Sequence, residues 1–261
     1  MENDVNTNLT HLSVWFKANK LSLNIDKTNY IVFKNRHSNR VYNDLNICID
    51  NVRITRVTHT KFLGVIVDES LTWSKHTSNV VNTLSKYCGI FYRLKSVLPS
   101  SALFSLYNTL VLPHIMYCNL IWADNNNSNL HLVHLKQKRL IRLCTNSHWL
   151  AHTPPLFKNL KTLTIYDIHK LTLGLFMYNF TAKNLPVNFT KYFVQIMHIH
   201  TYPTRISNDL RPAHFNYDLA RNTVKRQGPI LWNSLSSDLC KSNSVHIFKR
   251  KFKLYLLSYY K

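Results

Sequence analysis

The sequence predicts an α+β fold that is mostly helical, and three observations support this prediction. Hydrophobic residues make up 45% of the 261 residues and aromatic residues 12%, a composition typical of a globular chain. Runs of β-branched and aromatic residues are confined to roughly the first 70 residues. From Ser74 onwards, apolar residues recur at three- and four-residue steps, which is the period of a helix. A chain of this length can bury one large or two small cores.

The first part of the chain is expected to be a small mixed unit. An amphipathic helix is predicted over residues 5–19, where apolar residues follow a helical period. Four strands are expected because short β-branched and aromatic runs are bounded there by polar residues. These runs lie at residues 30–33, 45–49, 52–57 and 62–67. The second and third strands would form a hairpin around Asp50 and Asn51.

The rest of the chain is expected to be helical. The predicted helices lie at residues 75–98, 103–110, 130–144, 165–179 and 244–260. Pro113 should kink or end the second of these, and the polar run 124–129 separates it from the third. Pro154 and Pro155 favour a boundary. The predicted domains are therefore residues 1–72, 73–150 and 151–261.

Charge is the strongest signal in the composition. Lys and Arg number 33 against 12 Asp and Glu, which gives a formal net charge of +21. Self-repulsion of this size is tolerable chiefly when the partner is a polyanion, and nucleic acid supplies one through its phosphates. Ribosomal RNA or an acidic membrane would satisfy the same condition. Charge alone therefore indicates a class of partner.

Three basic helical segments are the best candidates for phosphate binding. Their cations are Lys75, Lys86 and Arg93; Lys136, Lys138, Arg139 and Arg142; and Lys249, Arg250, Lys251 and Lys253. In the first segment the cations lie opposite an apolar face, and a solvated helix surface explains such a stripe equally well. Acidic residues are nearly absent from all three segments, so salt bridges within a helix do not explain the repetition. Binding to a phosphate backbone does.

No catalytic or metal site is expected. The sequence has no Asp-Asp pair, and its one adjacent acidic doublet, Asp68 and Glu69, is interpreted as an exposed turn before a helix. Cys144, His148 and His152 follow at four-residue steps, but residues 149–155 should break that helix and the sequence shows no fourth ligand, so a structural role is favoured over a zinc site. No phosphate-cradling glycine loop is present, so neither a cofactor nor a small-molecule substrate is expected.

An intracellular location, nuclear or cytoplasmic, is expected. The five cysteines are odd in number, widely spaced and without a CxxC pair, and are interpreted as reduced and mostly buried. The residues after Met1 do not have the pattern of a secretory signal. No apolar run approaches the length of a membrane span, so a membrane partner is not expected.

Several blocks, in order along the chain, resemble the reverse transcriptases of non-LTR retrotransposons, in particular the Jockey-like and RTE-like RNA-directed DNA polymerases. The blocks are Trp15 to Asn24 with Lys27-Thr28 and Tyr30 to Phe33; Lys61 to Val65 with Asp68 and Leu71 to Trp73; Leu112 to Cys118 with Ile121-Trp122; Gln137 to Arg139 with Ile141-Arg142; and Gly228 to Leu235 with residues 248–257. The first block is similar to the segment that follows the catalytic YADD box. The resemblance covers nearly the whole chain.

The resemblance implies a C-terminal fragment of such a polymerase. The aspartates that hold Mg²⁺ in the full-length parent enzyme would precede this chain, which would therefore be inactive alone. The chain would retain contacts with an RNA/DNA hybrid or another nucleic acid. The alternative is a domesticated, non-enzymatic protein that serves as a basic nucleic-acid-binding or assembly module.

The resemblance also implies roles for particular regions. Residues 1–72 look like the end of the palm, residues 73–150 like a helical thumb, and residues 151–261 like a basic helical C-terminal region. Lys27 resembles a lysine that approaches the phosphates of the incoming nucleotide, although a surface lysine in a turn explains it equally well. Lys61, Phe62, Leu63 and Gly64 resemble the primer grip, where Gly64 would let the backbone approach the primer; a tight bulge in a strand is the plain alternative.

Overall fold

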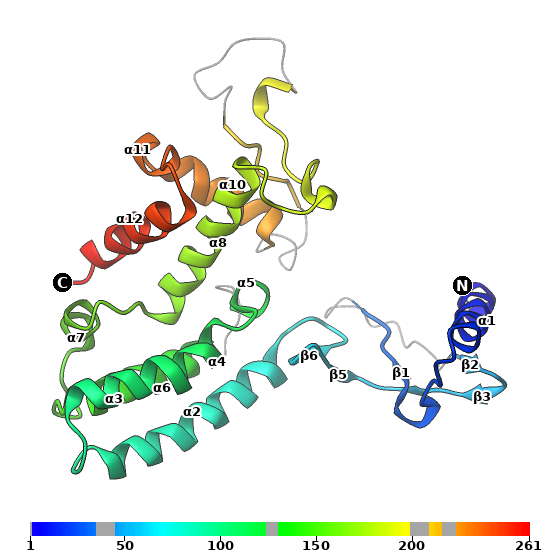
Figure 1. Ribbon diagram of the computed structural model, residues 1–261, viewed down its shortest axis with the longest axis horizontal. Helices are drawn as coiled ribbons and strands as arrows, with labels where there is room; N and C mark the ends of the chain where they lie inside the picture. The colour runs from blue at the N-terminus through cyan, green and yellow to red at the C-terminus, as the bar shows by residue number, and fades with distance from the viewer. Residues whose placement is uncertain (1, 35–44, 124–129, 199–208, 216–222) are drawn as a thin grey trace. The chain divides into compact units, whose positions relative to one another are not determined.

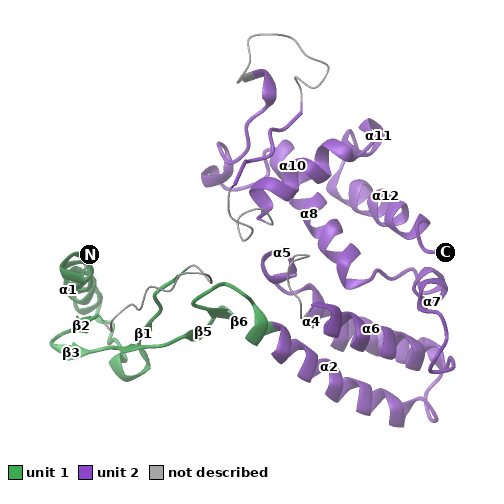
Figure 2. Cartoon of the chain, turned by 180° about the vertical axis from the view of Figure 1, so that it is seen from behind, with its two compact units in different colours: residues 1–76 green, residues 77–261 purple. Residues whose placement is uncertain are grey.

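The computed structural model describes residues 2–34, 45–123, 130–198, 209–215 and 223–261. It is mostly helical with small sheets, so the predicted α+β class is confirmed (Figure 1). The chain divides into two compact units, residues 1–76 and residues 77–261 (Figure 2). The predicted division into residues 1–72, 73–150 and 151–261 stays a prediction. The polar run 124–129 lies outside the described residues.

Unit 1 consists of one helix, a short 3-10 turn and three two-stranded sheets among its described residues. Its elements are α1 (Glu2–Ala18), η1 (Ile25–Lys27), β1 (Asn29–Tyr30), β2 (Cys48–Ile49), β3 (Val52–Arg53), β4 (Thr55–Arg56), β5 (His59–Phe62) and β6 (Val65–Asp68). β1 pairs with β4 in parallel, and β2–β3 and β5–β6 are antiparallel hairpins. The predicted hairpin turn at Asp50 and Asn51 is confirmed: both residues have positive φ, at 49° and 62°, as a two-residue turn requires.

All four strand predictions were wrong in extent. The strand expected over residues 45–49 is confined to Cys48–Ile49, and the one expected over residues 52–57 is divided into β3 and β4, which belong to different sheets. The strand expected over residues 30–33 ends at Tyr30. The strand expected over residues 62–67 is a hairpin, because Leu63 and Gly64 turn the chain with φ of 44° and 85°. Gly64 is thus a turn residue and not a bulge within one strand. The residues on either side of this turn form one short, β-branched run in the sequence. Its hydrophobic pattern is the same whether the run forms one strand or two.

The core of unit 1 forms where α1 packs against the β2–β3 hairpin. Ile47, Ile49 and Ile54 are buried, and Val5 and Leu9 of α1 pack against them. The Asp50 carboxylate at the hairpin turn accepts a hydrogen bond from Ser13 Oγ at 2.7 Å and forms an ion pair with Lys17 Nζ at 2.9 Å. The bonds from Lys17 and Ser13 lower the pKa of Asp50. These contacts fix the turn against the helix.

Unit 2 is helical. Helix α2 (Ser74–Leu94) begins in unit 1 and continues into unit 2. The elements that follow are α3 (Ser100–Leu106), the π-helical segment η2 (Tyr107–Val111), α4 (Leu112–Met116), α5 (Asn119–Trp122), α6 (Leu130–Cys144), α7 (Thr153–Asn159), α8 (Ile165–Thr181), η3 (Val187–Phe189), η4 (Ile196–His198), α10 (Val224–Ser234), α11 (Ser237–Cys240) and α12 (Val245–Ser258). Pro154 and Pro155 lie in the first turn of α7. The bounds predicted for α6 are confirmed without change.

Pro113 neither ends nor interrupts the helical run in which it lies. The backbone widens into the π-helical segment Tyr107–Val111, and α4 then begins with Pro113 in its first turn. A proline normally clashes with the carbonyl four residues earlier and lacks the N–H that would bond to it. A wider turn immediately before the proline removes that conflict, and the chain stays helical from Ser100 to Met116.

One buried amide joins three parts of unit 2. Gln137 of α6 is fully buried, and its Nε2 donates to Tyr107 Oη at 3.0 Å and to the Leu163 carbonyl at 2.9 Å. Its Oε1 accepts from Ile165 N at 2.9 Å. Burial raises the pKa of Tyr107, so its hydroxyl stays protonated as a hydrogen-bonding group. The amide thereby fixes α6 against η2 and the start of α8.

Helices α8 and α12 pack against each other (Figures 1 and 2), and they approach closely at Gly174. A Cβ at this position would lie 2.5 Å from Cε1 of Phe252, whose ring is fully buried. Nearby, Tyr178 Oη donates to the Ser242 carbonyl at 2.7 Å, and the Tyr178 ring stacks on Phe248. The glycine is therefore required by the close contact between the two helices.

We expect Gly174→Ala to destabilise the protein by about 1–2 kcal/mol, because overpacking costs more than the roughly 1 kcal/mol that alanine gains in helix propensity. Gly89→Ala is the matched control, since nothing lies within 4 Å of a Cβ at this exposed position of α2. That variant should be stabilised by up to about 1 kcal/mol. Urea unfolding measures both effects. Equal stabilisation by both substitutions would contradict the close contact.

Candidate nucleic-acid interface

The positive charge is concentrated in unit 2. Counted along the sequence, residues 77–261 hold 23 of the 33 Lys and Arg but only 5 of the 12 Asp and Glu, a net charge of +18 (23 − 5). Residues 1–76 hold the remaining 10 cations and 7 acids, a net charge of +3 (10 − 7). Electrostatic attraction to a polyanion is thus a property of unit 2 far more than of unit 1.

The side chains of α6 divide into a buried side and a basic side. Its inward positions are Leu130, Val133, Gln137, Leu140, Ile141 and Cys144. The four predicted cations occupy the other positions: Arg139 is exposed, while Lys136, Lys138 and Arg142 are half-buried. Long cationic side chains often pack their methylene stems while the charged end reaches solvent. The four cations therefore lie outside the buried face of the helix, with Arg139 and Arg142 on its outer side and Lys136 and Lys138 on its two flanks.

These cations are not neutralised by acidic side chains. Between Leu130 and Tyr166 the sequence holds six Lys and Arg and no Asp or Glu. Among the described residues, the ion pairs found involve other cations, in unit 1 Lys17, Lys34 and Arg56 and in unit 2 Lys170. Intramolecular salt bridges to the described residues therefore do not account for the basic side of α6.

Helix α2 lies next to α6. Cys88 of α2 donates from Sγ to the Lys136 carbonyl at 3.9 Å. Burial raises the pKa of the Cys88 thiol, and the positive charges of Arg139 and Lys136 partly oppose this. Lys86 and Arg93 are exposed on α2, on the side away from its buried residues Leu84, Cys88 and Phe91. The predicted opposition of apolar and cationic faces on α2 is confirmed for this part of the helix.

Arg142 also has a structural contact. Its Nε donates to the Ala151 carbonyl at 2.9 Å, in the turn that joins α6 to α7. In the C-terminal basic segment, Lys249, Arg250 and Lys251 are exposed on α12, and Lys253 is half-buried. Burial and the neighbouring charge of Lys249 lower the pKa of Lys253.

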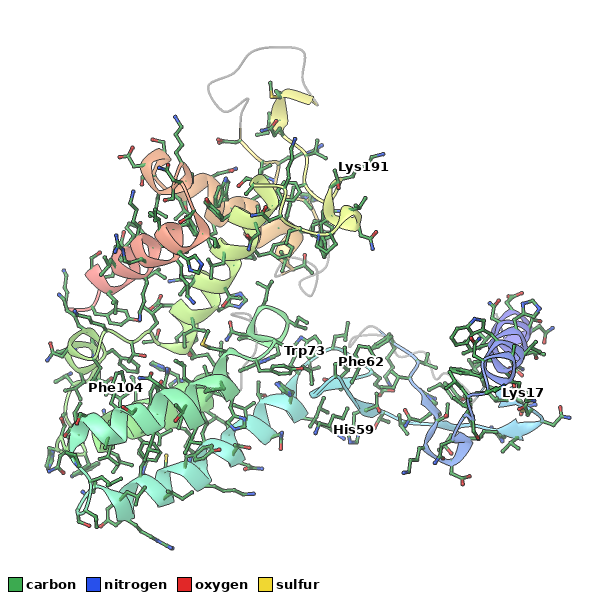
Figure 3. The ribbon with its side chains drawn as sticks, in the orientation of Figure 1. Lys17, His59, Phe62, Trp73, Phe104 and Lys191 are labelled. Carbon is green, nitrogen blue, oxygen red and sulfur yellow. The ribbon has the colours of Figure 1, made fainter. Side chains whose placement is uncertain are left out.

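The remaining predicted site residues belong to unit 1. Lys27 is exposed at the end of the 3-10 turn, where its N–H donates to Asn24 Oδ1 at 3.2 Å. Phe62 and Leu63 are 65% and 74% exposed at the tip of the β5–β6 hairpin, beside exposed Lys61 and Gly64 (Figure 3). Lys75 Nζ lies 2.8 Å from His59 Nδ1.

The interpretation of Asp68 and Glu69 as an exposed turn was wrong. Asp68 is 9% exposed, and its carboxylate accepts hydrogen bonds from the backbone N–H groups of residues 70, 72 and 73 and from Thr72 Oγ1. It thereby holds Leu71 and Trp73 in a left-handed conformation, with φ of 51° and 59°. Glu69 forms ion pairs with Lys34 and Arg56. Both acids organise the chain that leads into α2.

The cysteines and histidines show no metal centre among the described residues. Cys144 is buried and donates from Sγ to the Leu103 carbonyl at 3.7 Å, and burial raises its pKa to about 12. His148 is exposed. Only Cys88 and Cys144 of the five cysteines are fully buried, fewer than expected, and all five are free thiols.

Sequence reasoning missed a hollow of about 360 Å³ where α6, α7 and the end of the chain meet. Lys138 lines it together with His134, Phe157 and Tyr260. Burial, and secondarily the charge of Lys138, lowers the pKa of His134 to about 4. The ring of His134 lies 5.1 Å from that of Tyr166 and 6.5 Å from that of Phe157. Contacts between helices so far apart in sequence leave no local pattern.

The comparison with known proteins relates this chain to a polymerase of a mobile element. It is 28% identical over 160 residues to a protein of Drosophila melanogaster, the "Probable RNA-directed DNA polymerase from transposon X-element". The match covers 59% of this chain and 17% of the length of that polymerase. This distant similarity supports a relationship to the reverse transcriptases of non-LTR retrotransposons. No family model matches the chain, and no solved structure does. Among the described residues, no helix combines the length and apolarity that crossing a membrane requires.

From the low pKa of His134 we predict how the stability of the protein depends on pH. The folded protein keeps this ring neutral down to about pH 4, whereas the unfolded chain binds the proton near pH 6.5. The neutral His134 ring therefore contributes to the free energy of unfolding above about pH 6.5, and this contribution is lost as the pH falls toward 4. We expect His134→Phe, which keeps an aromatic ring between Phe157 and Tyr166, to reduce this loss by about 1–2 kcal/mol, allowing for partial exposure.

Urea unfolding of the variant and the wild-type protein at neutral pH and at about pH 4.5 measures the difference. His246→Phe is the control, because His246 is exposed on α12 and is not among the groups that shift the pKa of His134. It should leave the pH dependence of unfolding unchanged. A pH dependence that is identical in the His134 variant and the wild type would contradict the assignment.

Proposed function

We propose that this chain is a nucleic-acid-binding part of a reverse transcriptase of a non-LTR mobile element, the part that follows the polymerase active site. The observation that carries the proposal is the basic side of α6, where four cations are presented without acidic partners among the described residues. The similarity to a transposon RNA-directed DNA polymerase supports it. In this proposal residues 1–72 correspond to the end of the palm, and residues 73–150 to a thumb.

The ligand we propose is the sugar-phosphate backbone of an RNA/DNA hybrid. Lysine and arginine side chains on the outside of helices neutralise phosphates and release counterions, a contribution that does not depend on base sequence. The described cations of α2 and α6, Lys86, Arg93 and the four on α6, provide such contacts along two neighbouring helices. Binding should therefore tolerate any sequence and weaken steeply with salt.

Two elements of unit 1 have proposed roles that rest on the resemblance. The exposed tip of the β5–β6 hairpin, Phe62 to Gly64, would approach the primer strand, and its two-residue turn gives the close backbone approach that this role needs. Lys27, exposed on its 3-10 turn, would contact a nucleotide phosphate. We place both among the nucleic-acid contacts of the parent enzyme.

We further propose that residues 1–261 alone do not polymerise DNA. Nucleotide transfer needs paired carboxylates that hold two metal ions, and the sequence contains no Asp-Asp pair. Mg²⁺ would then be bound by the aspartates of the parent enzyme. Template-primer extension with Mg²⁺ and purified chain tests this proposal, and incorporation of nucleotides would contradict it.

We expect the triple variant Lys136→Gln, Lys138→Gln and Arg139→Gln to bind an RNA/DNA hybrid about tenfold more weakly or worse. The slope of log K against log salt should fall by roughly 2–3, because each lost phosphate contact removes about 0.9. Arg142 is left in place because it bonds to Ala151. Fluorescence anisotropy with a labelled hybrid at several salt concentrations measures both quantities.

The matched control removes the same charge elsewhere in unit 2. Lys183, Lys191 and Lys241 are exposed and lie outside α2 and α6 (Figure 3 labels Lys191). Their replacement by Gln should change affinity and slope much less. Equal losses for the two triple variants would show that overall charge, and not the α6 surface, binds the hybrid.

A further inference from the structure

The turn between α6 and α7 is held by its own hydrogen bonds. Asn146 ends α6 with φ of 50°, and Ser147 N donates to the Arg142 carbonyl at 3.0 Å, a common way to close a helix. Ala151 N then donates to the His148 carbonyl at 3.0 Å, which closes a four-residue turn. The Ala151 carbonyl in turn accepts from Arg142 Nε at 2.9 Å. The backbone on both sides of Trp149 and Leu150 is therefore fixed.

The two central residues of this turn contribute little to the core. Trp149 is 72% exposed and Leu150 is 62% exposed. Trp149 has the most exposed aromatic side chain among the large hydrophobic residues that the structure describes. An exposed apolar side chain is common on a protein surface, but a tryptophan held outward by a closed turn is an unusual use of so large a ring. Its fixed position means that little backbone entropy would be lost when the ring binds a ligand.

The surroundings of this turn are cationic. The turn lies within the stretch from Leu130 to Tyr166, which holds six cations and no acid. Arg142, whose Nε is bonded to the turn, carries its guanidinium charge to within two residues of Trp149. A basic protein partner would be repelled here, whereas a ligand that combines a flat apolar ring with a phosphate complements both features.

We propose that Trp149 is a stacking platform for a base of an unpaired nucleic-acid strand, with Arg142 contacting the adjacent phosphate. Aromatic side chains beside cations are the general means by which proteins hold single strands, because every base has a π-face. In a duplex the base faces are covered by neighbouring base pairs, so this contact is specific for unpaired nucleotides. The inference deepens the proposed function and rests on it: α6 would contact a duplex backbone, and the turn at its end an unpaired strand.

The test compares Trp149→Ala with Leu150→Ala in the full chain. Leu150 lies in the same turn and is similarly exposed, but it has no π-face. Anisotropy titrations use two probes, a short single-stranded RNA and an RNA/DNA hybrid. We expect Trp149→Ala to weaken binding of the single strand about tenfold or more and to leave hybrid binding unchanged. Leu150→Ala should change neither, and Trp149→Phe should retain part of the affinity.

The possible outcomes separate this inference from the proposed function. If the wild-type chain binds both probes and Trp149→Ala keeps its affinity for the single strand, the stacking platform is wrong and the duplex proposal stands. If Trp149→Ala and Leu150→Ala weaken binding of the single strand equally, the turn makes a general apolar contact and Trp149 is not a stacking platform. If the wild-type chain binds neither probe, both proposals are wrong. Unchanged circular dichroism and melting would show that the exposed substitutions leave the fold intact.

Discussion

The buried amide of Gln137 is the interaction on which the surface of α6 depends. Its three hydrogen bonds fix the rotation of the helix about its own axis, because any other rotation would leave a buried polar group without partners. Lys136 and Lys138 directly flank this residue in the sequence. Once Gln137 is directed inward, the neighbouring cations are carried to the flanks and the outer side. The positions of the α6 cations are therefore a consequence of the hydrogen bonds that the neutral Gln137 side chain makes in the core.

Unit 2 has few acidic side chains that could neutralise the cations of α6. Asp167 serves inside the fold: its carboxylate accepts from Tyr260 Oη at 2.5 Å and from Thr164 Oγ1 at 2.9 Å, and it pairs with Lys170. This cluster fastens the C-terminal residues to the start of α8. The low acid content costs stability through repulsion, and the stacking of Tyr178 of α8 on Phe248 of α12 contributes to offsetting it.

The sequence predicted what local patterns determine and missed what distant contacts determine. The period of α6 and the opposed faces of α2 follow from single helices, and the Asp50-Asn51 turn follows from its residues. The β5–β6 hairpin was missed because its first turn residue is Leu63, an unfavourable residue for positive φ, although Gly64 supplies part of the usual signal. Asp68 was misread because its partners are backbone N–H groups, which carry no sequence signature. The exposure of Trp149 depends equally on how the turn closes, and no pattern in the sequence distinguishes it from a buried ring.

Burial also separates the groups that control folding from those proposed to control binding. Four titratable groups inside unit 2 are held neutral by burial, which raises the pKa of the Cys88 and Cys144 thiols and lowers the pKa of His134 and His169. The proposed ligand contacts are lysines and arginines, whose side chains are as a class charged across the neutral range. Mild acid therefore acts on the stability of unit 2 well before it acts on the charge of these lysines and arginines. Loss of binding between pH 7 and 5 would then report unfolding, whereas loss of binding with added salt would report the phosphate contacts themselves.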